Sequence, residues 1–98
     1  MNLQELKAKL APKLHKYEIE GFTINIHRPC GRDIEKCDSA TNTIIICTKD
    51  ENGDPIFANE DIDGRINVNS IDFTFQTQIY KAILELLNID KSDEIEKK

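Results

Sequence analysis

Four side chains that could bind a soft metal or act as nucleophiles lie in the first half of the chain: His27, Cys30, Cys37 and Cys47. A structural zinc site usually has two pairs of closely spaced ligands, and only His27 and Cys30 have such spacing here. Zinc binding is therefore the less favoured interpretation, and we expect no bound metal. We predict that Cys47 lies in the core of a strand and that the other two thiols lie in or near a turn.

A second candidate site is an acidic stretch in which oxygen-bearing side chains alternate, as the ligands do in a calcium loop of the EF-hand kind. These side chains are Asn59, Asp61, Asp63 and Asn67. Gly64 has the place of the sharp turn, but Ser70 occupies the position where such a loop needs a bidentate carboxylate. Pro55, just upstream, also disfavours an entering helix. We favour a connecting loop and keep calcium binding as the alternative function.

A nucleophilic enzyme would need a Cys or Ser activated by a His, and the histidines of the sequence are His15 and His27. His15 lies in a charged segment, and strand alternation places His27 on an outward, polar face. The sequence contains no Gly-rich phosphate loop and no Trp. We therefore predict that the protein is not an enzyme, with no catalytic residue and no cofactor.

The composition is that of one folded domain. Of the 98 residues, 39% are hydrophobic and 32% are charged, which is ordinary for a globular protein. The formal net charge of -5 repels nucleic acid and anionic lipid, so we expect neither as a partner. The longest apolar run, Ile44 to Cys47, is far too short to cross a membrane. No apolar leader precedes the three cysteines, so we expect reduced thiols in the cytoplasm.

The N-terminal part of the chain predicts a short helix followed by a hairpin. Asn2 and Glu5 have the spacing of a capping box, and leucines follow at helical intervals until Pro12 ends the helix. From Tyr17 to Arg28 apolar and polar residues alternate, which is typical of half-buried strands. Gly21 permits the tight turn between them.

The central part of the chain predicts a second hairpin. Thr43 to Thr48 is rich in β-branched residues, and the turn signal from Asp50 to Pro55 leads into Ile56 and Phe57. A buried helix over Ala40 to Cys47 fits the same periodicity and is the alternative.

A long C-terminal helix is predicted from its N-cap, Ser70, to about Asn88. Its apolar side chains cover an arc of roughly 220°, against about 100° for a helix with one buried face. The excess apolar surface predicts a contact with another protein. Two alternatives are that the N-terminal helix covers this surface and that the helix lies at the centre of the fold. The predicted binding surface consists of Phe75, Ile79, Tyr80, Ile83, Leu84 and Leu87.

The predicted fold class is α+β. A short N-terminal helix, two β-hairpins that form a small antiparallel sheet, and a long C-terminal helix packed on that sheet make up a single domain of residues 1–90. Residues 91–98 are expected to form a charged flexible tail, because their charges alternate and Ile95 is their one apolar residue.

Three stretches of the sequence resemble the tail assembly chaperones of long-tailed phages. The first is a strand that runs into Arg28-Pro29 and is followed by Gly31-Arg32-Asp33. The second is the acidic turn from Asp50 to Pro55 with the apolar pair after it, and the third is the end of the C-terminal helix, Ala82 to Asn88. The resemblance spans residues 20–89. It departs from the family just before Asp50, where such proteins often have a helix.

The resemblance implies a chaperone that multimerises and coats the tape measure protein in the host cytoplasm. Its implied partners are the tape measure protein, whose hydrophobic segments it keeps soluble, the tail tube protein that polymerises around that client, and further copies of itself. Such proteins are often made in two lengths by ribosomal frameshifting. Lys97-Lys98 is compatible with a slippery codon run, so a frameshifted longer form is a hypothesis that the gene sequence would test.

Overall fold

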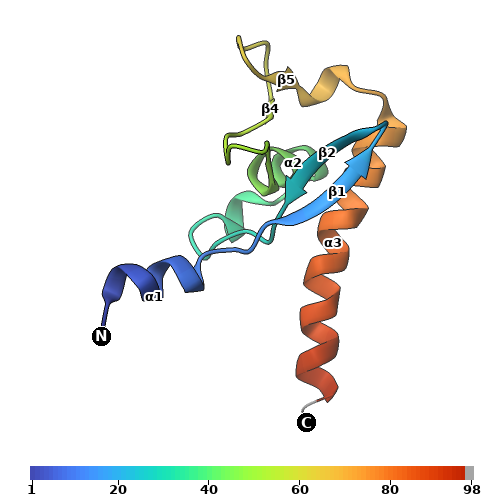
Figure 1. Ribbon diagram of the computed structural model, residues 1–98. Helices are drawn as coiled ribbons and strands as arrows, with labels where there is room; N and C mark the ends of the chain where they lie inside the picture. The colour runs from blue at the N-terminus through green and yellow to red at the C-terminus, as the bar shows by residue number, and fades with distance from the viewer. Residues whose placement is uncertain (97–98) are drawn as a thin grey trace.

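The computed structural model describes the backbone of residues 1–96 and the side chains of residues 1–87. It confirms the α+β fold, with a short N-terminal helix, a small antiparallel sheet in the order β1-β2-β3, and a long C-terminal helix (Figure 1). The elements are α1 (Leu3–Leu10), β1 (His15–Ile19), β2 (Phe22–Ile26), η1 (Ile34–Lys36), α2 (Ala40–Cys47), β3 (Thr48–Lys49), β4 (Phe57–Ala58), β5 (Ile66–Asn67), η2 (Val68–Ser70) and α3 (Phe73–Glu96).

Helix α1 begins and ends where the sequence predicts. The side-chain oxygen of Asn2 accepts hydrogen bonds from the amides of Gln4 (3.0 Å) and Glu5 (3.2 Å), which pairs two donors that the first turn leaves free. The helix ends at Leu10, two residues before Pro12. In Figure 1, α1 lies apart from the body and is joined to it by an extended segment.

Strands β1 and β2 form the predicted hairpin, with Ile19 opposite Phe22 at its turn. The turn has positive φ at both Glu20 (49°) and Gly21 (80°), and such turns match the right-handed twist of paired strands. Ile26, at the other end of β2, is buried in the core, whereas Phe22 is exposed. The core therefore buries Ile26 and contacts the half-buried Ile24, but leaves the outer end of the predicted apolar face uncovered.

The prediction of a second hairpin is wrong, because residues 40–47 form the helix α2. Ser39 caps this helix by accepting a hydrogen bond from the amide of Asn42 (3.2 Å). A helix that is apolar on nearly every side is stable when it is buried, and burial here overrides the strand preference of Ile and Thr. Of the expected hairpin, the structure keeps β3, which pairs with β2, and a bridge between Lys49 and Pro55.

Helices α2 and α3 pack against each other, and the core lies around their contact. Its buried apolar members are Ile26, Ile44, Cys47, Phe57, Val68, Ile79 and Ile83. Each fully buried Ile or Val stabilises the fold by about 1.5–3 kcal/mol relative to its exposed state. The core thus joins one end of the hairpin, both helices, and the strand β4.

Helix α3 begins after Asp72 and not after the predicted N-cap, Ser70. The Asp72 carboxylate accepts a hydrogen bond from the amide of Thr74 (2.8 Å), while the hydroxyl of Ser70 donates to the carbonyl of Asn67 (2.7 Å) and closes η2. The side-chain amide of Gln76 donates to the carbonyl of Val68 (2.7 Å). This bond explains why a polar residue interrupts the apolar arc of α3.

The backbone of α3 continues as a helix across residue 90 to Glu96, where the sequence predicts a separate flexible tail. Residues 97–98 and all side chains beyond Leu87 lie outside the described residues. The expected solvation of residues 91–98 therefore stays a prediction.

Strands β4 and β5 form a parallel pair, with Phe57 opposite Ile66. They are joined by residues 59–65, which we call the acidic loop because it contains Glu60, Asp61 and Asp63. In Figure 1 this pair and α1 lie at opposite ends of the molecule.

Candidate functional site

The structure divides the six predicted binding residues between the core and the surface. Ile79 and Ile83 are 2% and 0% exposed and belong to the core, so the prediction that they contact a partner is wrong. The alternative of a central helix accounts for this half of the apolar arc. The other four are half-buried: Phe75, Tyr80, Leu84 and Leu87.

A second apolar stripe runs along α3, on the side of Tyr80, Leu84 and Leu87. Phe73, which is 78% exposed, lies seven residues before Tyr80 and therefore on the same side of the helix. At 100° per residue the four side chains lie within about 60° of one another around the helix axis. We call these four residues the outer stripe. Tyr80 also contacts the edge of the core, which anchors the stripe to the folded body.

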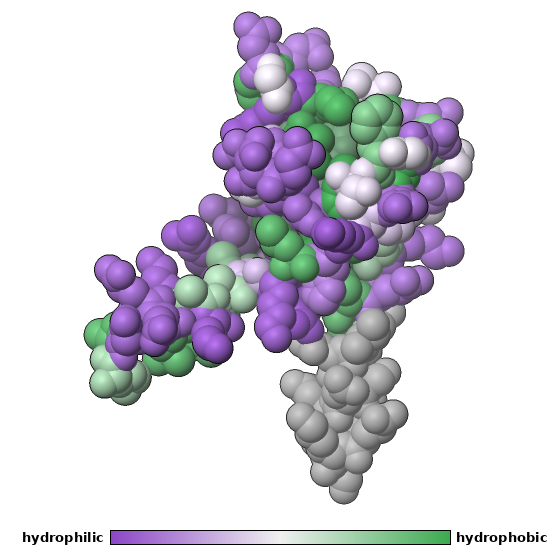
Figure 2. Space-filling model, in the orientation of Figure 1, coloured by the Kyte–Doolittle hydropathy of each residue, from purple (hydrophilic) through white to green (hydrophobic). Residues whose placement is uncertain are grey.

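Helix α1 carries a further apolar surface, which the sequence analysis did not assign to binding. Leu3, Leu6 and Leu10 are 70%, 42% and 75% exposed, and no residue of α1 is buried. Figure 2 shows apolar side chains along the lower edge of this helix. The alternative in which the N-terminal helix covers α3 is therefore wrong. Two features of the sequence could have predicted this exposed apolar surface. The leucines have helical spacing, and Pro12 separates α1 from the hairpin.

An open groove of about 970 Å³ lies between α1 and the body. Its apolar lining combines the leucines of α1 with side chains beyond the helix, namely Leu3, Leu6, Leu10, Leu14 and Ile46. Its lining also includes three cationic residues, Lys7, Arg32 and Lys49, and one acidic residue, Asp33. The groove is thus apolar along α1 and predominantly positive on both walls.

His27 lines the groove and is buried, so the prediction of a solvated strand histidine is wrong. Strand β2 ends at Ile26, and alternation does not extend to the residue after it. Nδ1 of His27 lies 2.7 Å from the carbonyl oxygen of Arg28 and must donate to it. Nε2 therefore accepts from Nζ of Lys49, at 3.2 Å. This arrangement requires a neutral imidazole ring.

The pKa of His27 is lowered from its usual value, first by burial and then by the charge of Lys49; the Arg28 carbonyl and Asp33 act in the opposite sense. Burial also lowers the pKa of Lys49, whose Nζ donates to the carbonyl of Ile46 at 2.9 Å. His27 and Lys49 therefore fasten the end of α2 to β2.

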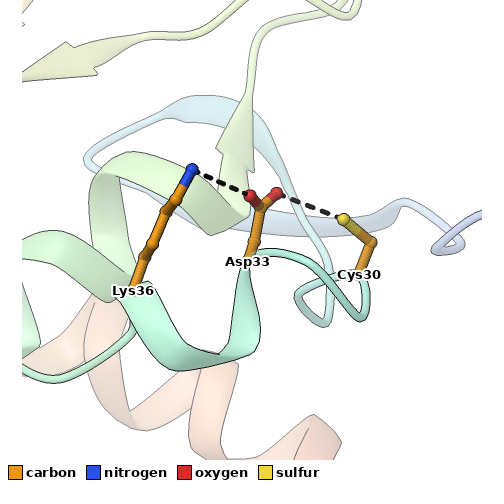
Figure 3. Close-up of polar contacts among 3 residues, drawn as sticks. All are labelled: Cys30, Asp33 and Lys36. Carbon is orange, nitrogen blue, oxygen red and sulfur yellow. Dashed lines mark hydrogen bonds and ion pairs between the residues drawn. The ribbon is translucent and has the colours of Figure 1, made fainter.

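The three cysteines are free thiols that differ in burial. Cys47 is fully buried, in α2 and not in the predicted strand, and burial raises its pKa to about 12, so the thiolate needed for nucleophilic attack does not form at neutral pH. Cys30 and Cys37 flank η1, which agrees with their predicted place near a turn. Figure 3 shows the Cys30 thiol donating to the Asp33 carboxylate (3.2 Å), which also pairs with Lys36 (3.8 Å). Among the described residues, no three His, Cys, Asp or Glu side chains converge as metal ligands.

The candidate calcium ligands lie in and just after the acidic loop. Asn59 follows the strand β4, so the loop lacks the entering helix of an EF-hand. The carboxylate of Asp61 accepts from the side-chain amide of Asn67 (3.2 Å), and the carbonyl of Asn59 accepts from that of Asn69 (3.3 Å). These hydrogen bonds between the two ends of the stretch favour a connecting loop.

The helices of the described chain include none with the length and apolarity to span a membrane. No family model, no curated protein and no solved structure matches this chain. The resemblance to tail assembly chaperones therefore rests on the sequence motifs alone.

Proposed function

We propose that this protein is a non-catalytic tail assembly chaperone that binds the tape measure protein of a long-tailed phage and self-associates during tail assembly. The observation that carries the proposal is the outer stripe of α3: Phe73, Tyr80, Leu84 and Leu87. An apolar stripe that is exposed at Phe73 and half-exposed along the rest of a helix anchored in the core suits contact with apolar segments of a client.

The helix α2 supports the proposal from a second direction. The sequence resemblance departs from the family just before Asp50, because Thr43 to Cys47 reads as a strand. In the structure this segment is helical, as it often is in that family. The Arg28-Pro29 motif lies directly after His27, beside the end of the same helix.

In this proposal the protein covers hydrophobic segments of the tape measure protein in the host cytoplasm until tail tube protein assembles around that client. A frameshifted longer form is part of the proposal, because Lys97-Lys98 is compatible with a slippery codon run. The contacts are reversible because the outer stripe is narrow and partly covered by its own fold.

Co-expression with the tape measure protein of the same gene cluster tests the proposal. We expect the wild-type chain to raise the soluble fraction of the client and to co-purify with it. Phe73→Asp should lower capture about tenfold, the effect of losing an aromatic anchor. Phe22→Asp is the matched control, because Phe22 is 74% exposed but lies on the hairpin. Absence of capture by the wild-type chain, or equal loss in both variants, would refute the proposal.

A further inference from the structure

Charge is distributed unevenly between the N-terminal segment and the rest of the chain. Residues 1–16 contain four Lys and one Glu, whereas residues 17–98 contain nine basic and seventeen acidic side chains. The positive segment includes α1, which contains Lys7, Lys9 and Glu5 and has no buried residue, whereas Lys13 and Lys16 follow the helix. A basic, apolar helix held apart from an acidic body can lower its free energy by contacting an acidic, apolar surface.

The groove beside α1 extends this positive surface onto the body. Lys7 lies on the α1 wall and Arg32 on the opposite wall, and both are exposed. Asp33 opposes them only weakly, because it pairs with Lys36 and accepts from the thiol of Cys30. Gly53, in the turn from Asp50 to Pro55, also lines the groove. The Asp50 carboxylate of that turn accepts hydrogen bonds from two backbone amides.

The acidic loop has the complementary properties. Glu60, Asp61 and Asp63 are exposed, and they are interleaved with apolar side chains that the fold leaves uncovered. Ile62 is 42% exposed and Ile66, which directly follows the loop, is 47% exposed. The loop and α1 lie at opposite ends of the molecule, so the acidic loop does not reach the groove of its own chain (Figure 1).

We infer that the acidic loop of a second copy of this chain docks in the groove beside α1. Ile62 and Ile66 of one copy contact the leucines of α1 in the other, and the loop carboxylates approach Lys7 and Arg32. Because the two surfaces differ, the contact is heterologous, and repeating it extends the assembly copy by copy. The inference deepens the self-association in the proposed function, and it uses residues outside the outer stripe.

Two variants and their mixture test the inference. The arm variant, Leu3→Ser with Leu6→Ser and Leu10→Ser, changes only residues that are not buried. The loop variant, Glu60→Lys with Asp63→Lys, reverses exposed charges, and Glu18→Lys with Glu85→Lys makes the same charge change at exposed positions elsewhere. Circular dichroism and thermal melting establish that every variant retains the folded body.

Light scattering after size-exclusion chromatography then gives the assembly state. We expect wild-type multimers that grow with protein concentration and shrink with salt, and the same for the control variant. The arm and loop variants should each be monomeric. Their equimolar mixture should form dimers and nothing larger, because the intact α1 of one variant can bind only the intact loop of the other.

Three results would overturn the inference: a monomeric wild type at all concentrations, multimers of either variant alone, or a mixture that stays monomeric. Client capture separates this inference from the proposed function. A monomeric wild-type chain that still captures the tape measure protein overturns the docking of the acidic loop and the self-association, but leaves the client binding of the proposed function standing. A multimer that dissociates as described but captures no client overturns only the chaperone proposal.

Discussion

Helices α1 and α2 have the same length and the same kind of N-cap, but they differ in what surrounds them. Each has eight residues, and each begins after a polar side chain that accepts from backbone amides, Asn2 in α1 and Ser39 in α2. Helix α1 buries no residue, whereas α2 buries Thr43, Ile44 and Cys47. The spacing of apolar residues therefore predicts where a helix forms, while its burial depends on neighbours that are distant in the sequence.

This difference also separates two kinds of stability. Opening α2 exposes the centre of the core and should unfold the whole domain, while α1 can unfold without disturbing any buried contact. Short isolated helices are marginal in water, so α1 needs either its cap or a partner to persist. The predictions that follow test this separation.

The largest effect is expected from Ile44→Ala in α2. Ile44 is fully buried between α2 and α3, so its truncation leaves a cavity and should lower the free energy of unfolding by about 2–5 kcal/mol. Urea denaturation followed by circular dichroism gives the value. A loss below about 1 kcal/mol would show that α2 is less central than the structure indicates.

Replacement of the two N-caps should give unequal results. Ser39→Ala removes the acceptor for the Asn42 amide and should lower the free energy of unfolding by about 1 kcal/mol. Asn2→Ala removes the equivalent acceptor in α1 and should reduce the helical signal before the transition, with the midpoint unchanged. Equal shifts of the two midpoints in urea would mean that α1 unfolds together with the core.

Acid should weaken the attachment of α2 to β2 through His27. The pKa of His27 in the folded state is lowered from 6.5, so the unfolded state binds more protons as the pH falls below that value. The free energy of unfolding should be highest above about pH 6.5 and should decline toward the folded pKa. Lys49 adds to this effect and Asp33 opposes it.

Denaturation at a series of pH values between 7 and 5 measures this decline. His27→Gln should be less stable at pH 7, since the Lys49 contact changes, but its stability should depend less on pH. If the wild-type chain and this variant lose stability in parallel as the pH falls, the decline comes from other groups.

The smallest effect is expected from Leu6→Ser in α1. The side chain is 42% exposed and lies outside the core, so the free energy of unfolding of a dilute sample should change by no more than about 0.5 kcal/mol. Thermal melting at low concentration provides the measurement. A larger loss would place α1 on the folded body of the same chain.

The parts of the fold that were predicted correctly depend on residues close together in the sequence. Asn2 and Pro12 bracket α1, and Gly21 permits the turn between β1 and β2, because each acts through its own backbone geometry. The long helix α3 was predicted from its apolar periodicity, which is also read from residues close together in the sequence.

The errors concern residues whose state depends on tertiary contacts. Ile44 to Cys47 have a high strand propensity, but they form a helix that is capped by Ser39 and buries Ile44 and Cys47 in the core. The wide apolar arc of α3 was recognised, yet periodicity does not show which half meets the core, and so Ile79 and Ile83 were assigned to the surface. His27 was misplaced because alternation was extended one residue past the end of β2.

Because Cys47 is buried, the rate at which its thiol is alkylated reports how often the core opens. A protonated thiol with no exposed surface cannot react with an alkylating reagent until α2 separates from its neighbours. Cys30 and Cys37, which are half-buried, should be modified first. The slow phase of alkylation then counts global openings at native conditions, without denaturant, and any partner that stabilises the folded chain will lengthen it.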